Sequence, residues 1–250
     1  MKDIQSQLDN RRINIQKVGV KTISYPITVR DKSKSEQNTI ATLNMYVNLP
    51  HKFKGTHMSR FIEVLNLYHG KIDIRNFHRI LEKIKERLEA EASHLEVEFP
   101  YFLSTQQHSG GLMVRHYTCT LIGSLYEQVD VQLKVSVPIS LPVLQKIDSL
   151  LPRLNGLWGK AEVTVRFSRF MWIEDLLLHI ENSIEMELQS FAQSKNTSLP
   201  VEPVALQIGN GLNRLDVVRT YSVCVENLGA DYSTFATLDS TYGNSLGGFA

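Results

Sequence analysis

Cysteine is scarce in this chain, with two residues among 250. Cys119 and Cys224 each lie in a strand-like run, and neither belongs to a Cys-x-x-Cys pair of the kind that binds metals. The sequence also lacks any apolar run near the ~20 residues that a membrane-spanning helix needs, and its polar N-terminus does not resemble a signal peptide. We therefore expect a cytoplasmic protein with free thiols and no membrane partner.

Neither sign of charge is in excess, because the chain has 27 Lys and Arg residues and 26 Asp and Glu residues. Without a global positive field the protein is not drawn to polyanions, so we expect no nucleic-acid partner. The Walker phosphate loop, the Rossmann glycine pattern and the Ser-His-Asp arrangement are absent as well. The 42% hydrophobic and 21% charged composition is typical of a compact globular protein.

Hydrophobic periodicity indicates strands separated by helices. Apolar spacings of three and four predict one helix capped by Thr56, a second capped by Asp73, and a long third one that begins near Ile173. The Ser/Asn/Pro-rich stretch 193–203 predicts a loop. Strands with segregated helices are typical of the α+β class. Alternating apolar and polar residues predict strands at 39–48, 95–99, 114–122, 129–137, 161–167 and 217–226.

We divide the chain into four segments. Residues 1–25 form an N-terminal extension, 26–138 a first module, 139–236 a second module, and 237–250 a Gly- and Ser-rich tail that we expect to be mobile.

Two segments resemble the type IB GTP cyclohydrolase family: residues 54–61, KGTHMSRF, and residues 94–102, HLEVEFPYF. The resemblance implies a tunnelling fold of two ββααββ-type modules, with antiparallel sheets and helices packed on one side. It also implies a homo-oligomeric barrel that binds small purine- or pterin-like heterocycles at subunit interfaces. We expect the strand at 39–48 to be an edge strand that requires such assembly.

The resemblance also implies two glutamates in the site. The family anchors its ligand through a buried glutamate that accepts hydrogen bonds from ring N–H groups, and Glu202 lies at the matching distance after Glu187 and Leu188. A solvated loop glutamate is the alternative for Glu202. Glu187 occupies the position of the family's metal-binding glutamate, and its alternative is a helix-end residue whose charge reaches solvent.

The family's zinc site is not reproduced in this sequence. The position of its thiolate falls at Pro142, one imidazole falls near Leu154 or Asn155, and the other near Tyr232. A single carboxylate does not hold zinc tightly at neutral pH. We therefore expect no metal and no other cofactor.

A few other residues are candidates for the chemistry. His57 opens the helix of the first matched segment, as a catalytic residue or as an interface residue. Glu96 and Glu98 lie on one face of a strand and could bind a ligand or act as an acid/base pair, the alternative being a solvated face. We interpret His94 and His116 as structural.

Three functions fit these observations. The first is a divergent enzyme with a purine- or pterin-type pocket, in a specialised biosynthetic pathway and without zinc-dependent hydrolysis of GTP. The second is a GTP cyclohydrolase that makes dihydroneopterin triphosphate with a remodelled metal site. The third is a non-catalytic binding or assembly subunit. The activity implied by the resemblance is that of a hydrolase on cyclic amidines.

Overall fold

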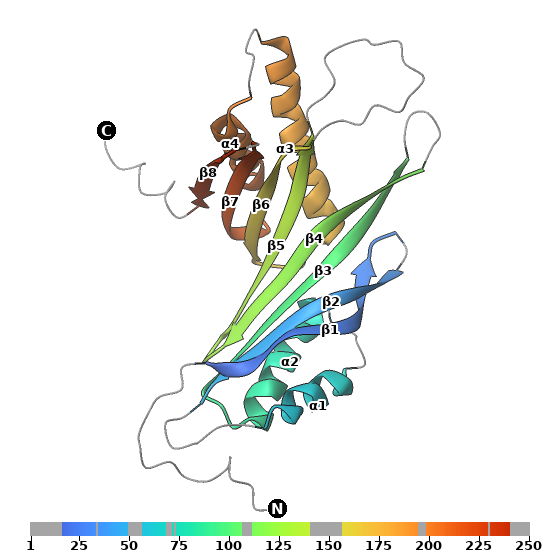
Figure 1. Cartoon of the computed structure of the whole chain (residues 1–250), viewed down its shortest axis with the longest axis vertical. Helices are drawn as coiled ribbons and strands as arrows, with labels where there is room; N and C mark the ends of the chain where they lie inside the picture. Colours follow the sequence, from blue (N-terminus) through green and yellow to red (C-terminus); the bar gives the residue numbers. More distant parts are fainter. Residues whose placement is uncertain are drawn as a thin grey trace, which may run out of the picture. The chain divides into compact units, whose positions relative to one another are not determined.

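The computed structural model describes residues 17–33, 35–49, 57–68, 72, 74–106, 112–140, 157–194, 199–229 and 231–240. These residues form one eight-stranded sheet and four helices, which confirms the α+β class (Figure 1). The strands keep their chain order across the sheet, so β1 and β8 are its edges. The elements are β1 (Val18–Asp31), β2 (Ser35–Asn48), α1 (Ser59–Leu67), α2 (Ile74–Arg87), β3 (Ala92–Gln106), β4 (Leu112–Leu125), β5 (Val129–Ser140), β6 (Leu157–Phe167), α3 (Ile173–Gln193), α4 (Val201–Leu212), β7 (Val218–Leu228) and β8 (Ser233–Asp239).

The chain divides into two compact units. Unit 1 comprises Met1–Phe102 and Thr118–Leu133, and unit 2 comprises Leu103–Tyr117 and Lys134–Ala250. The long strands β3, β4 and β5 therefore contribute residues to both units. The order of strands and helices is compatible with two ββααββ-type modules, and this division into modules stays a prediction.

Unit 1 is built on the alternation of β2 and β3. Leu43 and Met45 on β2 and Val97 on β3 are fully buried, while the residues between them are more exposed. The buried face of α2 shows the helical spacing that the sequence predicts, with Phe77, Ile80, Leu81 and Ile84 all inaccessible to solvent. Burying such a side chain stabilises the fold by about 1.5–3 kcal/mol.

The approach of α2 to the sheet depends on a glycine. A Cβ atom at Gly123 of β4 would lie 2.3 Å from the ring of Phe77, closer than real Cβ contacts allow. Ser93 adds a specific link, because its hydroxyl donates to the carbonyl of Leu81 at 2.7 Å. The helix is therefore fixed against one face of unit 1, and the opposite face of β2 and β3 carries polar side chains.

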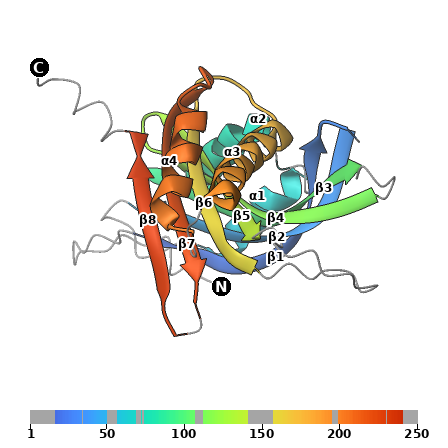
Figure 2. The ribbon, with the colours of Figure 1, turned by 90° about the horizontal axis from the view of Figure 1, so that it is seen from above.

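Unit 2 packs α3 and α4 together, and α4 against β7 and β8 (Figure 2). Leu176, Leu177 and Ile180 of α3 are fully buried, as are Val204 and Ile208 of α4. None of the helices in the described part of the chain is long and apolar enough to cross a membrane.

The sequence missed α4 entirely. The predicted loop 193–203 in fact ends in the first turn of this helix, which begins at Val201. Pro203 lies in that first turn, where a proline costs little because the N–H groups there have no helical partner. Gly209 and Gly211 then lower the helical propensity, so the periodic signal was weak.

Three boundaries also differ from the predictions. β1 begins at Val18, inside the expected N-terminal extension 1–25. β2 is not an edge strand, because it pairs with β1 on one side and with β3 on the other. β8 continues to Asp239, so the first residues of the expected tail 237–250 belong to a strand, and 241–250 lie outside the described residues.

Candidate functional site

Polar side chains gather on the face of β2 and β3 opposite to the buried one. The antiparallel register places Asn44 opposite Glu96. The Asn44 amide donates from Nδ2 to Glu96 Oε2 at 2.9 Å, and the Tyr46 hydroxyl donates to Glu96 Oε1 at 3.0 Å. Each oxygen of the half-buried carboxylate thus accepts one hydrogen bond and keeps a further lone pair for a ligand.

An imidazole packs beside this carboxylate. His94 lies opposite Tyr46, and their rings stack with centroids 4.7 Å apart. Tyr126 meets the His94 ring edge-on at 5.4 Å, and His94 Nε2 lies 2.8 Å from Asn48 Oδ1. The ammonium of Lys17 lies 4.6 Å from the centroid of the Tyr46 ring. We call this group the Glu96 cluster: Lys17, Asn44, Tyr46, Asn48, His94, Glu96 and Tyr126.

The cluster fixes the protonation of two of its members. Burial, followed by the hydrogen bond to Glu96 and its charge, raises the pKa of Tyr46 to about 12. Burial and the nearby Lys17 charge lower the pKa of His94, while Glu96 acts in the opposite sense. At neutral pH the cluster therefore combines a neutral phenol and a neutral imidazole, both suited to hydrogen bonding without a change of charge.

The candidates of unit 1 are only partly brought together. Glu96 is inside the cluster, and Glu98 is exposed on the same strand, opposite Thr42. His57 lies just before α1, half-buried, and its carbonyl accepts a hydrogen bond from the Arg60 N–H at 3.1 Å. Glu96 already accepts hydrogen bonds from two donors. This arrangement favours a role as an oriented hydrogen-bond acceptor over a role as an acid/base group.

The candidates of unit 2 lie on the α3 and α4 pair. Glu187 is half-buried near the end of α3, and Glu202 is exposed in the first turn of α4, which corrects its expected position in a loop. The two helices pack against each other, and Gln207 Nε2 on α4 lies 3.8 Å from Met186 Sδ on α3.

A second, half-buried group of hydrogen bonds joins β4 to α3 in unit 2. The hydroxyl of the buried Tyr117 donates to Glu181 Oε1 at 2.5 Å, and Arg115 Nη1 lies 2.7 Å from the same oxygen. Burial, and then the hydrogen bond to Glu181, raise the pKa of Tyr117. This group satisfies its own polar atoms and links a strand to a helix, which is a structural role.

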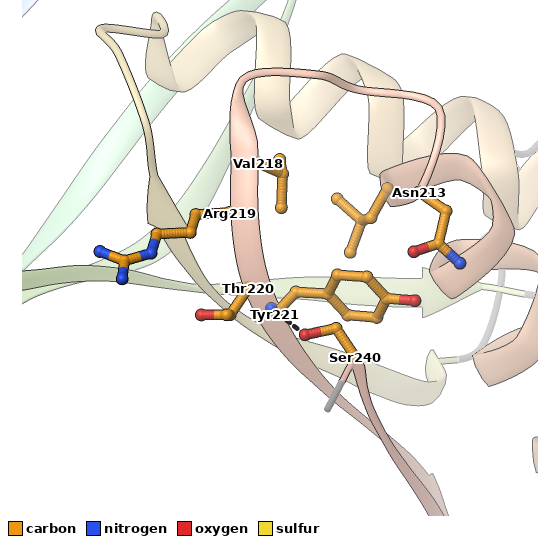
Figure 3. Close-up of a pocket in the computed structure, with 7 residues that line it drawn as sticks. Asn213, Val218, Arg219, Thr220, Tyr221 and Ser240 are labelled. Carbon is orange, nitrogen blue, oxygen red and sulfur yellow. Dashed lines mark hydrogen bonds between the residues drawn. The ribbon is translucent and has the colours of Figure 1, made fainter. Parts of the chain in front are cut away.

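A small hollow of about 170 Å³ lies at the end of α4, beside the start of β7. Figure 3 shows the Tyr221 ring pointing to the side of Asn213, with the Arg219 side chain directed away from that ring. Burial raises the pKa of Tyr221, and a side-chain hydrogen bond with Asn213 opposes this shift. None of the candidate residues from the sequence lines this hollow.

The described residues do not fit the zinc site that the resemblance implies. Among them, no three His, Cys, Asp or Glu side chains are grouped so that they could hold a metal ion. Tyr232 is 75% exposed and offers only a phenol, while Pro142, Leu154 and Asn155 lie outside the described residues.

Sequence reasoning missed most of the Glu96 cluster. The polar residues Asn44, Tyr46 and Asn48 alternate along β2, as His94 and Glu96 do along β3. This alternation shows that each set shares a face, but the pairing register that joins the two sets depends on tertiary structure. The sequence therefore does not indicate that His94, which we interpret as structural, stacks on Tyr46.

Comparison with known proteins gives a consistent family. A family model described as Type I GTP cyclohydrolase folE2 matches residues 1–197. The GTP cyclohydrolase FolE2 of Syntrophus aciditrophicus is 42% identical over 241 residues, which cover 91% of this chain and 94% of that protein. The FolE2 proteins of Syntrophobacter fumaroxidans and Geobacter metallireducens are 41% and 39% identical, each over 96% of this chain and at least 97% of their own length.

Similar solved structures share the fold at low sequence identity. The uricase from Arthrobacter globiformis has a TM-score of 0.55 and 7% identity, and covers 90% of this chain and 92% of its own. Urate oxidase from Bacillus sp. TB-90 has a TM-score of 0.55 and 11% identity, with coverages of 90% and 99%. This likeness supports the tunnelling-type fold.

Proposed function

Because this chain belongs to the type I GTP cyclohydrolase FolE2 family, we propose that it binds GTP and hydrolyses the imidazole ring of the purine base. The observation that carries the proposal is the 42% identity to a GTP cyclohydrolase FolE2 that extends over nearly the full length of both chains. The reaction adds water at C8 and breaks the C8–N9 bond to give a formamidopyrimidine. A second water releases C8 as formate, and the ribose carbons then close the new ring of dihydroneopterin triphosphate with loss of water.

The proposed residue roles follow the chemistry of each position. Glu96 offers two oriented acceptor oxygens, and these suit the adjacent N–H donors of a purine edge. Glu202 is the second candidate for this contact, and the exposed Glu98 adds negative charge beside Glu96. Glu187 and His57 are the candidates for catalytic residues.

Finer parts of the proposal concern the subtype and the metal. We propose that the chain belongs to subtype IB, as a divergent member that works without tightly bound zinc. A heterocycle pocket that serves another reaction in a specialised pathway, and a non-catalytic binding or assembly subunit, are the alternatives. We also propose that the chain assembles with copies of itself.

The test is turnover of GTP by the purified protein. Formate release and the fluorescence of oxidised neopterin report the two stages of the reaction. Thermal unfolding with GTP, purines and pterins reports binding, since a ligand at 100 times its Kd adds ~2.7 kcal/mol of stability. Turnover would support the cyclohydrolase, and binding without turnover would favour the divergent enzyme or a non-catalytic binding subunit. Absence of both would contradict the proposal and leave the non-catalytic assembly subunit.

A further inference from the structure

The last turn of α4 comes close to α3 at Gly211. Gly211 is buried and lies within the helix, where alanine is intrinsically favoured over glycine. A Cβ atom at this position would lie 2.5 Å from Ser183 Oγ and 3.1 Å from His179 Nε2, both on α3. The first distance is shorter than real Cβ contacts, and the second is tighter than most of them. The absence of a side chain at Gly211 therefore allows the two helices to approach each other this closely.

The two α3 side chains are held in place around Gly211. Ser183 is 5% exposed, and its hydroxyl donates to the His179 carbonyl at 3.0 Å, a hydrogen bond that holds the side chain in this rotamer. His179 Nε2 is buried and has no hydrogen-bond partner among the described residues. A buried polar atom of this kind costs stability, so its presence requires an explanation. Packing against Gly211 explains it. We call these three residues, Gly211, His179 and Ser183, the Gly211 seat.

We propose that the residues of the Gly211 seat are positioning residues, which fix α4 on α3 and thereby hold Glu202 in place for the base of the substrate. The inference rests on the proposed function, in which Glu202 is a candidate acceptor for that base. Glu202 and Gly211 belong to one continuous helix and are about 14 Å apart along its axis. A shift of the last turn of so short a helix also moves its first turn. Glu187 lies on α3, so the seat also affects the distance between the two candidate carboxylates.

The first test examines the seat and needs no nucleotide. We expect Gly211→Ala to lower the melting temperature by roughly 2–4 °C, because the added Cβ overpacks the contact with α3. In a Ser183→Ala background the same substitution should lower it by less than half as much, since the atom at 2.5 Å is gone.

Gly209→Ala is the matched control for the first test. It adds the same Cβ to the same helix, but the nearest atom is Leu238 Cδ2, the far end of a flexible side chain that can rotate away. We expect no loss of melting temperature in this variant. An equal loss in Gly209→Ala, or an undiminished loss from Gly211→Ala in the Ser183→Ala background, would overturn the seat.

The second test asks whether the seat acts through Glu202. Calorimetric titration with GTP is carried out well below the melting transition, where every variant is folded and a merely structural role would leave the affinity unchanged. We expect Gly211→Ala to bind GTP about tenfold more weakly, because a misplacement of about 1 Å is enough for such a loss. Ser183→Ala should restore part of the affinity. In a Glu202→Gln background, Gly211→Ala should cause no further loss.

The outcomes separate the inference from the proposed function. Wild-type affinity in Gly211→Ala, or an equal loss of affinity with and without Glu202→Gln, would overturn the positioning while GTP binding by the wild-type protein still stands. If the wild-type protein does not bind GTP, the proposed function and the positioning are both wrong. The melting temperatures then still decide whether the Gly211 seat holds the two helices together.

Discussion

At the scale of single residues, the hydrogen bond between Tyr46 and Glu96 couples a phenol to a carboxylate. Burial is the largest cause of the raised pKa of Tyr46, about 12, and Glu96 adds to it. A group whose pKa is raised on folding contributes stability in its protonated form. This contribution is fully present below about pH 10 and is lost as the pH rises towards about 12.

We predict that Glu96→Gln lowers the pKa of Tyr46 from about 12 towards the ordinary value of 10, without reaching it because burial remains. The measurement is the ultraviolet absorbance of tyrosinate against pH, with the signal of the same variant carrying Tyr46→Phe subtracted. The control is Glu36→Gln, because Glu36 lies at the opposite end of β2 from Tyr46. An unchanged titration of Tyr46 in Glu96→Gln would show that the hydrogen bond does not form.

Cys224 is a half-buried thiol among charges on β6 and β7. Glu162 lies opposite Cys224, and Lys160 contacts both Glu162 at 2.9 Å and Glu226 at 3.4 Å. Burial, then Glu162 and Glu226, raise the pKa of Cys224, and Lys160 opposes them. Only the thiolate reacts, so the native thiol should be sluggish. Cys119 is fully buried and should react only on unfolding.

We predict that Glu162→Gln accelerates alkylation of Cys224 by iodoacetamide a few-fold at mildly alkaline pH, because it removes a charge that disfavours the thiolate. Lys160→Met should slow the reaction, since it removes the opposing charge. Mass spectrometry of the labelled peptides follows both cysteines separately. Equal rates in all three proteins would mean that these charges do not act on the thiol.

At the scale of helices and strands, the sequence predicted those elements whose two faces differ in polarity. The alternation in β2 and the three- and four-residue spacing in α2 located both elements to within a few residues. No strand was predicted at β1. One reason is that neither face of its first half, up to Tyr25, is fully buried. α4 was missed because Pro203 and two glycines weaken its pattern, although its buried face is complete.

The corrected position of Glu202 changes what its substitution should do. A carboxylate in the first turn of a helix interacts favourably with the helix dipole, typically by about 0.3–1 kcal/mol. The site prediction from the sequence assumed a loop, where no such term exists. The environment of Glu202 therefore depends on its being in a helix, which tertiary packing determines. Its distance from Glu187 along the sequence does not show this.

We predict that Glu202→Gln weakens GTP binding by roughly one to two orders of magnitude if it anchors the base, because ring N–H donors then lose a charged acceptor. The free energy of unfolding should fall by only about 0.3–1 kcal/mol. Calorimetric titration and chemical denaturation measure the two effects. Glu185→Gln, exposed on α3, should alter neither. Wild-type affinity in Glu202→Gln would remove this residue from the site.

At the scale of the whole molecule, the metal content of the purified protein tests whether it has lost the family's zinc site. We predict well below one zinc ion per chain in protein purified without chelators, since Pro142, the region of Leu154 and Asn155, and Tyr232 supply neither thiolate nor imidazole. Elemental analysis by plasma mass spectrometry gives the stoichiometry. About one zinc per chain, lost in Glu187→Ala, would contradict the prediction and would assign Glu187 to a remodelled metal site.

Assembly is the other property of the whole molecule. Within the described residues the strand order makes β1 and β8 the edges of the sheet, in place of the strand at 39–48 that the sequence indicated. Phe235 on β8 and the nearby Tyr232 are 69% and 75% exposed, so two aromatic side chains reach solvent at this edge. Pairing with a second copy would satisfy the backbone groups and cover these rings.

We predict a homo-oligomer at micromolar concentration, and a loss of assembly in Phe235→Lys because a charge on an edge strand opposes pairing between copies. Ile40→Lys is the matched control, since Ile40 is 66% exposed but lies on the interior strand β2, opposite Pro26 of β1. Sedimentation velocity gives the state of each protein, and circular dichroism shows that the fold is retained. A stable wild-type monomer would refute assembly, and an intact oligomer in Phe235→Lys would place the contact elsewhere than β8.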